Sequence, residues 1–577
     1  MTINTSHRQE PASVKSEGLA ANYGQHPIHD RAQRPLQVLV IGAGPSGIAM
    51  LIELLRVPFI TIRCVEKNAD VGGTWLETRY PGAACDVASH AYQYSFKSKT
   101  DWSRHFAPAE EIGDYFISVA KTYDLYPYIT FNSRVISAEW NESNALWHVQ
   151  VVDSANGDTV ETFVADVLIN AGGILNDWAW PEIDGLQSFK GHKVHTAAWD
   201  PAIDLKNKSV AVIGSGASSI QVVPSIQPVA EKIDVYVRSP TYILPTVGFG
   251  VESSSFNEPY TKSEIERFST DLSYYKEFRK RIEQQMNENF SSSRKASSEQ
   301  AKARLWAENM MKKAIASPEL QEKLIPSWEL GCRRLTPGLP YLNAVQQPNV
   351  NIIRDGIKRI TEVGIETDDG RVTEIDVIIF ATGFVTSFSS RFNIVGRHGH
   401  TLKEMWKDRG AEAYLGTAIA GLPNYFTLLG PNCPIANGSL VPCIEQSVKY
   451  ITQVLEKMQR DQIKFLQVKQ HVQDAFNDYA QEVHKDLVWT GSCNSWYRDK
   501  STGRVTAVWP GSSIHYMEMI DNPRWEDFEI EYIHSNPFMF MGNGISQRET
   551  TGGDLTFCEL PDSCPFHCAD ILDEDLD

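Results

Sequence analysis

The sequence lacks long apolar runs, an excess of positive charge and closely paired cysteines. A membrane-spanning helix needs about 18 to 20 consecutive apolar residues, and no stretch of this chain approaches that length. We therefore expect no membrane insertion. The 54 basic and 72 acidic residues give a formal charge of −18, which disfavours binding to nucleic acid or to an anionic membrane surface.

The nine cysteines stand mostly alone, and the chain contains neither a CxxC nor a CxxxxC pair. This pattern favours reduced thiols in a cytoplasmic protein over a disulfide scaffold. The one cluster, Cys558, Cys564, His567 and Cys568, lacks the ligand spacing of a zinc site, so we predict no metal site. Residues 1–35 are polar and lack the apolar segment of a signal peptide, so we expect a disordered or extended N-terminal arm.

Residues 36–66 combine a strand, a glycine-rich turn, a helix and a second strand. The run LQVLVI leads into GAGPSG, and the strand ITIRCVE ends at Glu66, 24 positions after the first glycine. This unit predicts a Rossmann-type site for FAD or NAD, in which the turn approaches the pyrophosphate and the carboxylate accepts hydrogen bonds from the ribose diol. Its predicted cofactor-binding residues are Gly42, Gly44, Ser46, Gly47 and Glu66.

A second unit of the same kind begins at residue 208. KSVAVI leads into GSGASS, and KIDVYV is followed by Arg238, again 24 positions after the first glycine. Because a guanidinium pairs with a 2′-phosphate where a carboxylate would not, this second site is predicted to bind NADP. Its predicted residues are Gly214, Gly216, Ala217, Ser218, Ser219, Arg238 and Ser239.

Two similar strands, DVLINAGG (166–173) and DVIIFATG (376–383), each follow a β-rich segment. We therefore predict an α/β fold of two Rossmann-like dinucleotide-binding domains, for FAD and NADP, with a helical subdomain. The predicted boundaries are 1–35 for the arm, 36–185 for the first part of the FAD domain, 186–205 for a linker, 206–345 for the NADP domain with a helical insertion at 252–325, 346–545 for the second part of the FAD domain with substrate-site elements, and 546–577 for an acidic tail.

Two nucleotide sites in one chain favour a relay in which NADPH passes hydride to FAD. The reduced flavin could then reduce a disulfide or react with dioxygen. A disulfide reductase needs paired cysteines beside the flavin, and none is present, so the sequence favours dioxygen.

The stretches GGTWLETRYPGAACD (72–86) and FKGHKVHTAAWD (189–200) resemble the two motifs of Baeyer–Villiger monooxygenases. The resemblance extends over residues 36–520 and implies an NADPH- and O2-dependent conversion of a ketone to an ester or lactone through a C4a-peroxyflavin. It also implies a secondary metabolite or another large cyclic ketone as substrate. The pattern F-x-G-x-x-x-H-x-x-x-W-[P/D] is met at Phe189, Gly191, His195, Trp199 and Asp200.

The resemblance also assigns roles to single residues. Arg334 matches the catalytic arginine, and Asp86 matches an aspartate beside it and the flavin. Arg333 stands where a lysine usually helps to bind the 2′-phosphate, and Trp496 matches a tryptophan at the nicotinamide ribose. The positions expected to contact the flavin are Thr74, Trp75, Asp86, Tyr92 and Val135.

Several alternatives stay open at this point. His195 and Trp199 could act in catalysis, but we favour a mechanical role, in which they hold the two domains and let their relative orientation change. Val385 follows Gly383-Phe384 where many family members have aspartate, which keeps N- or S-oxidation as an alternative. A redox-responsive flavoprotein without turnover is a third possibility. The expected partners are a small-molecule ketone and O2, and the oligomeric state is not predicted.

Overall fold

The computed structural model describes residues 34–154, 157, 159–244, 257–288, 290–388, 390–433 and 436–556. Both predicted dinucleotide units lie within these ranges. The predicted arm up to residue 33 and the cluster of Cys558, Cys564, His567 and Cys568 lie outside them. Within the described ranges, no helix combines the length and the apolar character needed to cross a bilayer.

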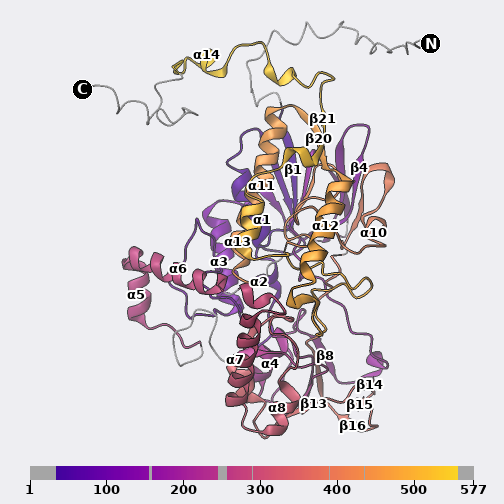
Figure 1. Ribbon diagram of the computed structural model, residues 1–577. Coiled ribbons are helices and arrows are strands. Elements are labelled where there is room, and N and C mark those ends of the chain that lie inside the picture. The colour runs from indigo at the N-terminus through magenta and orange to yellow at the C-terminus, as the bar shows by residue number, and fades with distance from the viewer. Residues whose placement is uncertain are drawn as a thin grey trace, which may run out of the picture. The chain divides into compact units, whose positions relative to one another are not determined.

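The first parallel sheet contains the two strands of the first glycine-rich unit and has the order β19-β7-β1-β2-β3. Figure 1 labels its strand β1 and the helix α1. β1 lies between two parallel neighbours, which explains its continuous apolar sequence. Helix α1 (Pro45–Leu54) follows β1 and buries most of its residues. The strands are β1 (Leu36–Ile41), β2 (Ile60–Val65), β3 (Ile129–Thr130), β7 (Val167–Asn170) and β19 (Tyr425–Thr427).

The second parallel sheet contains the two strands of the second glycine-rich unit and has the order β13-β10-β9-β17-β8. Helix α4 (Ala217–Ile226) follows β9 as α1 follows β1. Thus the two predicted Rossmann-like units both form, each with its own sheet. The strands are β8 (His192–His195), β9 (Ser209–Ile213), β10 (Lys232–Tyr236), β13 (Val350–Ile353) and β17 (Val377–Phe380).

The second sheet is wider than the predicted domain boundaries allow. β8 lies in the stretch predicted as a linker (186–205), yet it pairs with β17. β13 and β17 come after the predicted end of the NADP domain at residue 345, yet they pair with β10 and β9. The predicted boundary at residue 345 lies too early in the chain, because pairing between strands far apart in sequence leaves no local pattern. The chain returns to the first sheet only at β19.

The β-rich segments before β7 and β17 form two smaller sheets, as predicted, and the first of these also takes in β18, which follows β17 in the chain. One has the order β18-β4-β5-β6 and the other the order β14-β15-β16. Their strands are β4 (Ser133–Asn141), β5 (Leu146–Asp153), β6 (Thr159–Ala165), β14 (Ile357–Ile360), β15 (Gly364–Thr367), β16 (Val372–Glu374) and β18 (Asn393–Val395).

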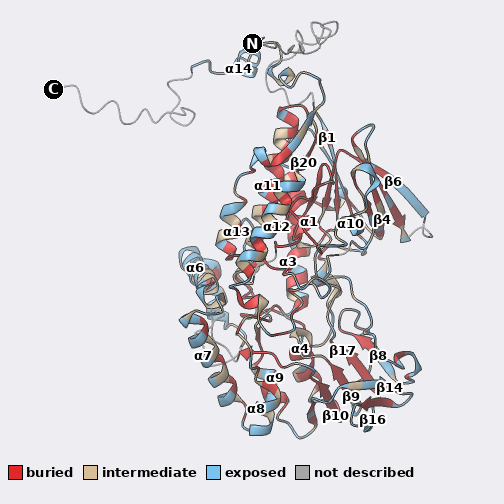
Figure 2. Ribbon diagram, turned by 45° about the vertical axis from the view of Figure 1, so that its right-hand side comes forward, coloured by how far each residue is buried: buried red, intermediate tan, exposed pale blue. Residues whose placement is uncertain are grey.

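Four α-helices occupy the described part of the predicted helical insertion (252–325). α5 begins with a capping box between Thr261 and Glu264, which satisfies N–H groups of its first turn. α7 buries Ala307 and Met311 in the core of the second unit, where Trp306 packs against them. Figure 2 shows the exposed faces of α6 and α7 in pale blue and the strands of the second sheet in red. The helices are α5 (Lys262–Thr270), α6 (Leu272–Asn287), α7 (Ser298–Ala314) and α8 (Pro318–Leu324).

The described chain separates into two compact parts, which differ from the two glycine-rich units. The larger comprises Leu36–Val454 and Leu466–Glu529 and contains both parallel sheets. The smaller comprises, of the described residues, 34–35, 455–465 and 530–556, and within it Lys464 forms an ion pair with Glu531 at 2.8 Å. The remaining elements are α2 (Thr74–Glu77), α3 (Ala109–Thr122), β11 (Ile243–Leu244), β12 (Thr336–Pro337), α9 (Leu339–Ala344), α10 (Leu402–Met405), α11 (Leu440–Arg460), β20 (Ile463–Val468), α12 (Gln470–His484), α13 (Ser513–Met519), β21 (Phe528–Tyr532) and α14 (Gln547–Thr551).

Candidate active site

Close backbone contacts shape the first glycine-rich turn. Gly42 has a φ of +98°, and its N–H donates to the carbonyl of Val65 at 2.8 Å. A Cβ on Gly47 would lie 1.9 Å from the carbonyl oxygen of Gly42, so no larger residue fits there. Gly44 is the N-cap of α1 and provides no side-chain cap, so the first N–H groups of the helix are available to a pyrophosphate. Gly42, Gly44 and Ser46, in that first turn, line a cavity of about 500 Å³, which is called the cavity below.

Glu66 is fixed at the end of β2 beside this turn. Its two carboxylate oxygens accept hydrogen bonds from the N–H groups of Ala43, at 2.7 Å, and Asn68, at 2.8 Å. The residue is only 4% exposed, and burial raises the pKa of its carboxyl group. Each carboxylate oxygen keeps a further acceptor site, and the residue lines the cavity, so this geometry suits a ribose diol.

The other residues expected to contact the flavin line the same cavity. The Trp75 indole N–H donates to the hydroxyl of Tyr92 at 3.3 Å, and the two rings meet edge to face. Burial raises the pKa of Tyr92, so this hydroxyl stays protonated. Thr74 begins α2, and Val135 lies on β4 at an irregularity in the pairing with β5. The structure therefore brings these four residues together with Glu66.

The second glycine-rich turn repeats the local geometry of the first. Gly214 has a φ of +127°, and a Cβ there would lie 2.3 Å from the carbonyl oxygen of Ala381. Gly216 is the N-cap of α4, whose first turn contains Ala217 and Ser218. Ser219 is fully buried beneath this turn, which agrees with the small residue expected at the third glycine position.

Two arginines, Arg238 and Arg333, lie beside the second turn. Arg238 follows β10 and is exposed, whereas Arg333 is half-buried. Arg333 donates through Nη1 to the carbonyls of Ser239, at 3.2 Å, and Pro240, at 3.0 Å. Burial, with the neighbouring charge of Arg238, lowers the pKa of Arg333. Two guanidinium groups that influence each other in this way favour binding of an anion, and the 2′-phosphate of NADP is such an anion.

Asp86 and Arg334 form a two-bond ion pair on the wall of the cavity. The Asp86 carboxylate accepts hydrogen bonds from Nε at 2.6 Å and from Nη2 at 2.7 Å. The carboxylate raises the pKa of Arg334, so the guanidinium stays charged. The pair uses Nε and Nη2, which leaves Nη1 outside it. The Arg334 side chain is 40% exposed and lines the cavity, so its cation can meet a bound molecule.

Tyr497 is a site residue that sequence reasoning missed. Its hydroxyl interacts with the Arg334 guanidinium and lies close to the Asp86 carboxylate. Burial raises its pKa, so the phenol stays neutral. Trp496, which was predicted, lines the cavity beside it, with ring centroids 4.8 Å apart. The NSWY stretch was the available signal, but only its tryptophan was assigned a role.

Arg391 was also missed, and no sequence motif marks it. It donates through Nη1 to the carbonyl of Gly172, at 2.8 Å, and through Nη2 to that of Gly173, at 3.2 Å. Burial lowers its pKa, against the opposing effect of Asp177 and other nearby carboxylates. Arg391 thus places a second cation on the cavity wall, at the end where Glu66 lies.

A side-chain contact joins the two glycine-rich units. Gln221, on α4, accepts a hydrogen bond from the hydroxyl of Tyr80 at 2.6 Å and donates to the carbonyl of Ala84 at 2.9 Å. A Cβ on Gly82 would lie 2.1 Å from the Ser225 hydroxyl oxygen, so the backbone approaches α4 closely there. The segment that ends at Asp86 therefore packs on the helix of the second unit.

The linker motif packs on the second unit. His195, on β8, is 1% exposed and stacks on Trp178 with ring centroids 4.7 Å apart. Its Nδ1 accepts the N–H of Ala197 at 3.0 Å, so Nε2 holds the proton and donates to the Thr382 hydroxyl at 3.1 Å. Trp199 packs against the core of the second unit.

The rest of the motif is structural as well. A Cβ on Gly191 would lie 2.5 Å from the carbonyl oxygen of Asp376, and Phe189 is buried in a core cluster of the second sheet. Asp200 caps a turn by accepting the N–H of Ala202 at 2.9 Å. The hydrogen bond of His195 and the packing of Trp199 that the mechanical role requires are both present. The change in the relative orientation of the domains stays a prediction.

The expectation of reduced thiols throughout was wrong for two cysteines. Cys332 and Cys493 form a disulfide across a sequence separation of 161 residues. Folding places the segment before Arg334 against the segment before Trp496, which spacing alone could not indicate. Cys64, Cys85, Cys433 and Cys443 are free and buried.

The cavity of about 500 Å³ is lined by Glu66 and Arg391 and also by Asp86, Arg334 and Trp496, whereas Arg238 and Arg333 are not among its lining residues. The turn around Gly44 forms a cradle, because a Cβ on the facing Gly73 would lie 2.9 Å from the Gly44 Cα. The cradle, the anchored carboxylate and the adjacent aromatic wall fit an adenine dinucleotide such as FAD. The Arg238–Arg333 pair fits a second, phosphorylated dinucleotide.

Known proteins resemble this chain over nearly its whole length. The family described as flavin-binding monooxygenase-like matches residues 36–304. The FAD-binding monooxygenase stcW of Emericella nidulans is 39% identical over 554 residues, which cover 94% of this chain and 90% of that protein. A Baeyer–Villiger monooxygenase of Pseudomonas aeruginosa is 34% identical over 540 residues, covering 93% of this chain and 98% of the relative.

A solved structure gives the same picture of the fold. Cyclohexanone monooxygenase from Rhodococcus sp. Phi1, bound to NADP+, superposes with a TM-score of 0.75 at 27% identity. The superposition covers 86% of this chain and 100% of the other.

Proposed function

The chain belongs to the flavin-binding monooxygenase family, within its Baeyer–Villiger type, and from this premise we propose that it converts a ketone into an ester or lactone. It is an NADPH-dependent flavin monooxygenase with FAD as its cofactor. The substrate we propose is a secondary metabolite or another large cyclic ketone. Support comes from the fungal relative and from apolar residues of the cavity wall, among them Phe388, Leu440 and Ile444.

The observation that carries the proposal is the ion pair of Arg334 with Asp86. Oxygen insertion beside a ketone makes the carbonyl oxygen negative before the carbon skeleton rearranges. A fixed cation in a site of low water content stabilises that charge, and such preorganised groups contribute about 10²- to 10³-fold to the rate. The Asp86 fork fixes the guanidinium plane, and Nη1 lies outside that fork. We assign Arg334 as the catalytic cation and Asp86 as the group that orients it.

The cofactors would bind at the two glycine-rich turns. When bound, FAD supplies the chemistry of hydride uptake and oxygen activation. Gly42 and Glu66 would hold its pyrophosphate and ribose, and Arg238 with Arg333 would hold the 2′-phosphate of NADPH. Tyr497, neutral because burial raises its pKa, would add a hydrogen bond beside the Arg334 cation. We also propose a cytoplasmic location, in which Cys64, Cys85, Cys433 and Cys443 would stay reduced. The Cys332–Cys493 disulfide would persist there because both of its cysteines are buried away from reductants.

Incubation of the purified holoenzyme with NADPH and a panel of ketones tests the function. We expect a product heavier by one oxygen atom, identified as an ester or lactone by mass spectrometry. Arg334→Ala should lower the rate of product formation by about 10²- to 10³-fold. Arg334→Lys is the matched control, since it keeps the positive charge but loses the paired hydrogen bonds to Asp86. Its rate should lie between the rates of the wild type and of Arg334→Ala.

Ester formation by Arg334→Ala at the wild-type rate would overturn the assigned mechanism. A panel that also contains amines and thioethers tests the reaction class. Oxidation of these compounds with all ketones left unchanged would replace the proposal with N- or S-oxygenation.

A further inference from the structure

Residues 493–506, the arch, bring Trp496 and Tyr497 to the Arg334 end of the cavity. We propose that two anchors position this arch, the Cys332–Cys493 disulfide at its start and the Arg504–Glu412 ion pair near its end. The anchors thereby set the placement of Tyr497 against Arg334. Only the activity readouts of this inference rest on the proposed function.

The arch is folded back on itself by backbone contacts. Arg498 and Val505 form an antiparallel bridge, and the N–H of Asp499 donates to the carbonyl of Arg504 at 2.9 Å. The N–H of Thr506 donates to the carbonyl of Tyr497 at 3.0 Å. Because these contacts join the backbone around Arg504 to the backbone around Tyr497, we expect a displacement of Arg504 to move Tyr497 as well.

The first anchor joins the arch to the segment of the catalytic arginine. Cys332 lies two residues before Arg334, and Cys493 lies three residues before Trp496. The two segments also pack without the disulfide, because a Cβ on Gly491 would lie 2.5 Å from a carboxylate oxygen of Glu329. The disulfide thus fixes the spacing between two segments that both line the same end of the cavity.

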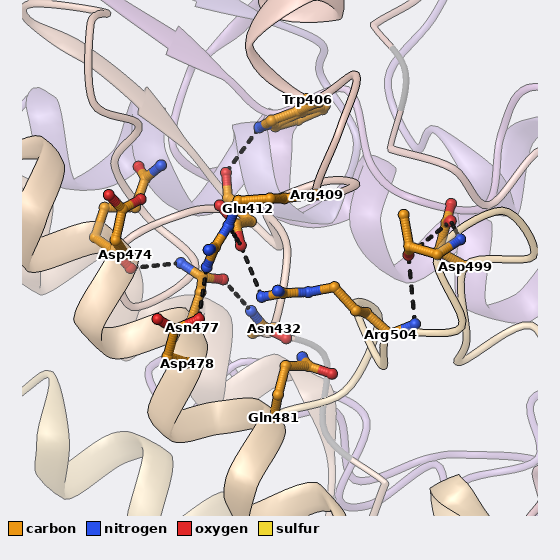
Figure 3. Close-up of polar contacts among 12 residues, drawn as sticks. Trp406, Arg409, Glu412, Asn432, Asp474, Asn477, Asp478, Gln481, Asp499 and Arg504 are labelled. Carbon is orange, nitrogen blue, oxygen red and sulfur yellow. Dashed lines mark hydrogen bonds and ion pairs between the residues drawn. The ribbon is translucent and has the colours of Figure 1, made fainter.

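The second anchor is a buried carboxylate shared by two arginines (Figure 3). Glu412 is 5% exposed, and it accepts hydrogen bonds from Arg504 at 2.7 Å and from Arg409 at 2.9 Å. Arg409 also pairs with Asp478 at 2.6 Å and makes no contact with the arch in any hydrogen bond or ion pair of the described residues. Loss of one partner of a buried ion pair leaves an uncompensated charge, so Arg504 has a strong preference for this place.

The backbones of Glu412 and of Thr506, at the end of the arch, are also hydrogen-bonded to residues at the cavity wall. The Trp406 indole N–H donates to the carbonyl of Glu412 at 3.0 Å, and Trp406 lines the cavity. The N–H of Asn432, which follows the cavity residue Pro431, donates to the carbonyl of Thr506 at 2.8 Å. Figure 3 shows Trp406, Glu412, Arg504 and Asn432 around one centre. The end of the arch is therefore set by the same residues that shape the wall.

A matched pair of variants tests the second anchor, because Arg504 and Arg409 meet the same carboxylate and only Arg504 belongs to the arch. The first readout is the rate of tryptic cleavage after Arg498 and Lys500, followed by mass spectrometry. The second is the dissociation constant of NADP+, measured by calorimetry on the holoenzyme. We expect Arg504→Met to raise both by about tenfold and Arg409→Met to change neither by more than about twofold. Arg504→Lys should restore part of the loss.

The double variant Cys332→Ser/Cys493→Ser tests the first anchor with the same two readouts and the same expected direction. A third readout is the share of NADPH oxidation that ends as hydrogen peroxide instead of oxygenated product. Both anchor variants should raise this share severalfold. Tyr497→Phe should raise it too, without faster cleavage, because it removes only the hydroxyl that meets Arg334.

Equal effects of Arg504→Met and Arg409→Met would show general destabilisation and overturn the proposal. Unchanged cleavage and NADP+ affinity in Arg504→Met would overturn it as well, whether or not the cysteine variant folds. If the wild-type protein oxygenates no ketone, the proposed function fails, while cleavage and NADP+ binding still decide the inference.

Discussion

Replacement of His195 by glutamine should change how the stability of the protein depends on pH. Burial lowers the pKa of His195 to about 4 from a reference value of 6.5. Because the folded state binds the proton less tightly than the unfolded state, this histidine contributes stability above pH 6.5 that is lost as the pH falls toward 4. With these values, the loss between pH 7 and pH 5 is about 2 kcal/mol.

The assay is urea unfolding of the wild type and of His195→Gln at several pH values in this range. Other buried histidines, such as His90 and His484, also have lowered pKa values, but their effects are common to both proteins and cancel in the difference. The wild type should be the more stable protein at pH 7, and its advantage should shrink by about 2 kcal/mol at pH 5. An advantage that stays constant across the range would refute the assignment of His195 as a buried, neutral donor to Thr382.

Three further substitutions test the cofactor sites. Arg238→Ala should raise the KM for NADPH by about 10- to 150-fold through the loss of a charged hydrogen bond and leave the KM for NADH unchanged; an equal rise for both coenzymes would contradict a role at the 2′-phosphate. Glu66→Gln should weaken FAD binding by about tenfold or more, because its NH2 group would face one of the two N–H groups, of Ala43 or Asn68, that donate to the carboxylate; cofactor release followed by flavin fluorescence measures this. Gly47→Ala should yield protein without flavin absorbance, since its Cβ would lie 1.9 Å from the Gly42 carbonyl oxygen; normal flavin content would show that the turn can shift.

The parts of the fold that could be predicted are those encoded in contiguous residues. The strand, turn, helix and strand around Gly42 and around Gly214 each occupy about 30 residues, as expected for such a unit, and both fold as expected. The width of the second sheet could not be predicted, because β13 and β17 reach it only after the long helical insertion. Pairing between distant strands depends on the tertiary fold, not on the local pattern.

The site divides in the same way. The Asp86–Arg334 pair joins residues 248 positions apart, and only the family resemblance pointed to it. The resemblance gave no indication of Cys332 with Cys493, and Arg391 follows no motif at all. These contacts depend on where loops lie after folding, which neither periodicity nor spacing encodes.

The contact of Gln221 with Tyr80 and Ala84 would let the two nucleotide sites influence each other's affinity. Helix α4 begins at the turn where NADP would bind, and through Gln221 it holds the backbone two residues before Asp86. A dinucleotide that favours one position of α4 therefore favours one placement of the Asp86–Arg334 pair. By reciprocity, a flavin state that prefers that placement raises the affinity for NADP by the same factor. The retention of the coenzyme and the redox state of the flavin would then both depend on one equilibrium, that between the positions of α4.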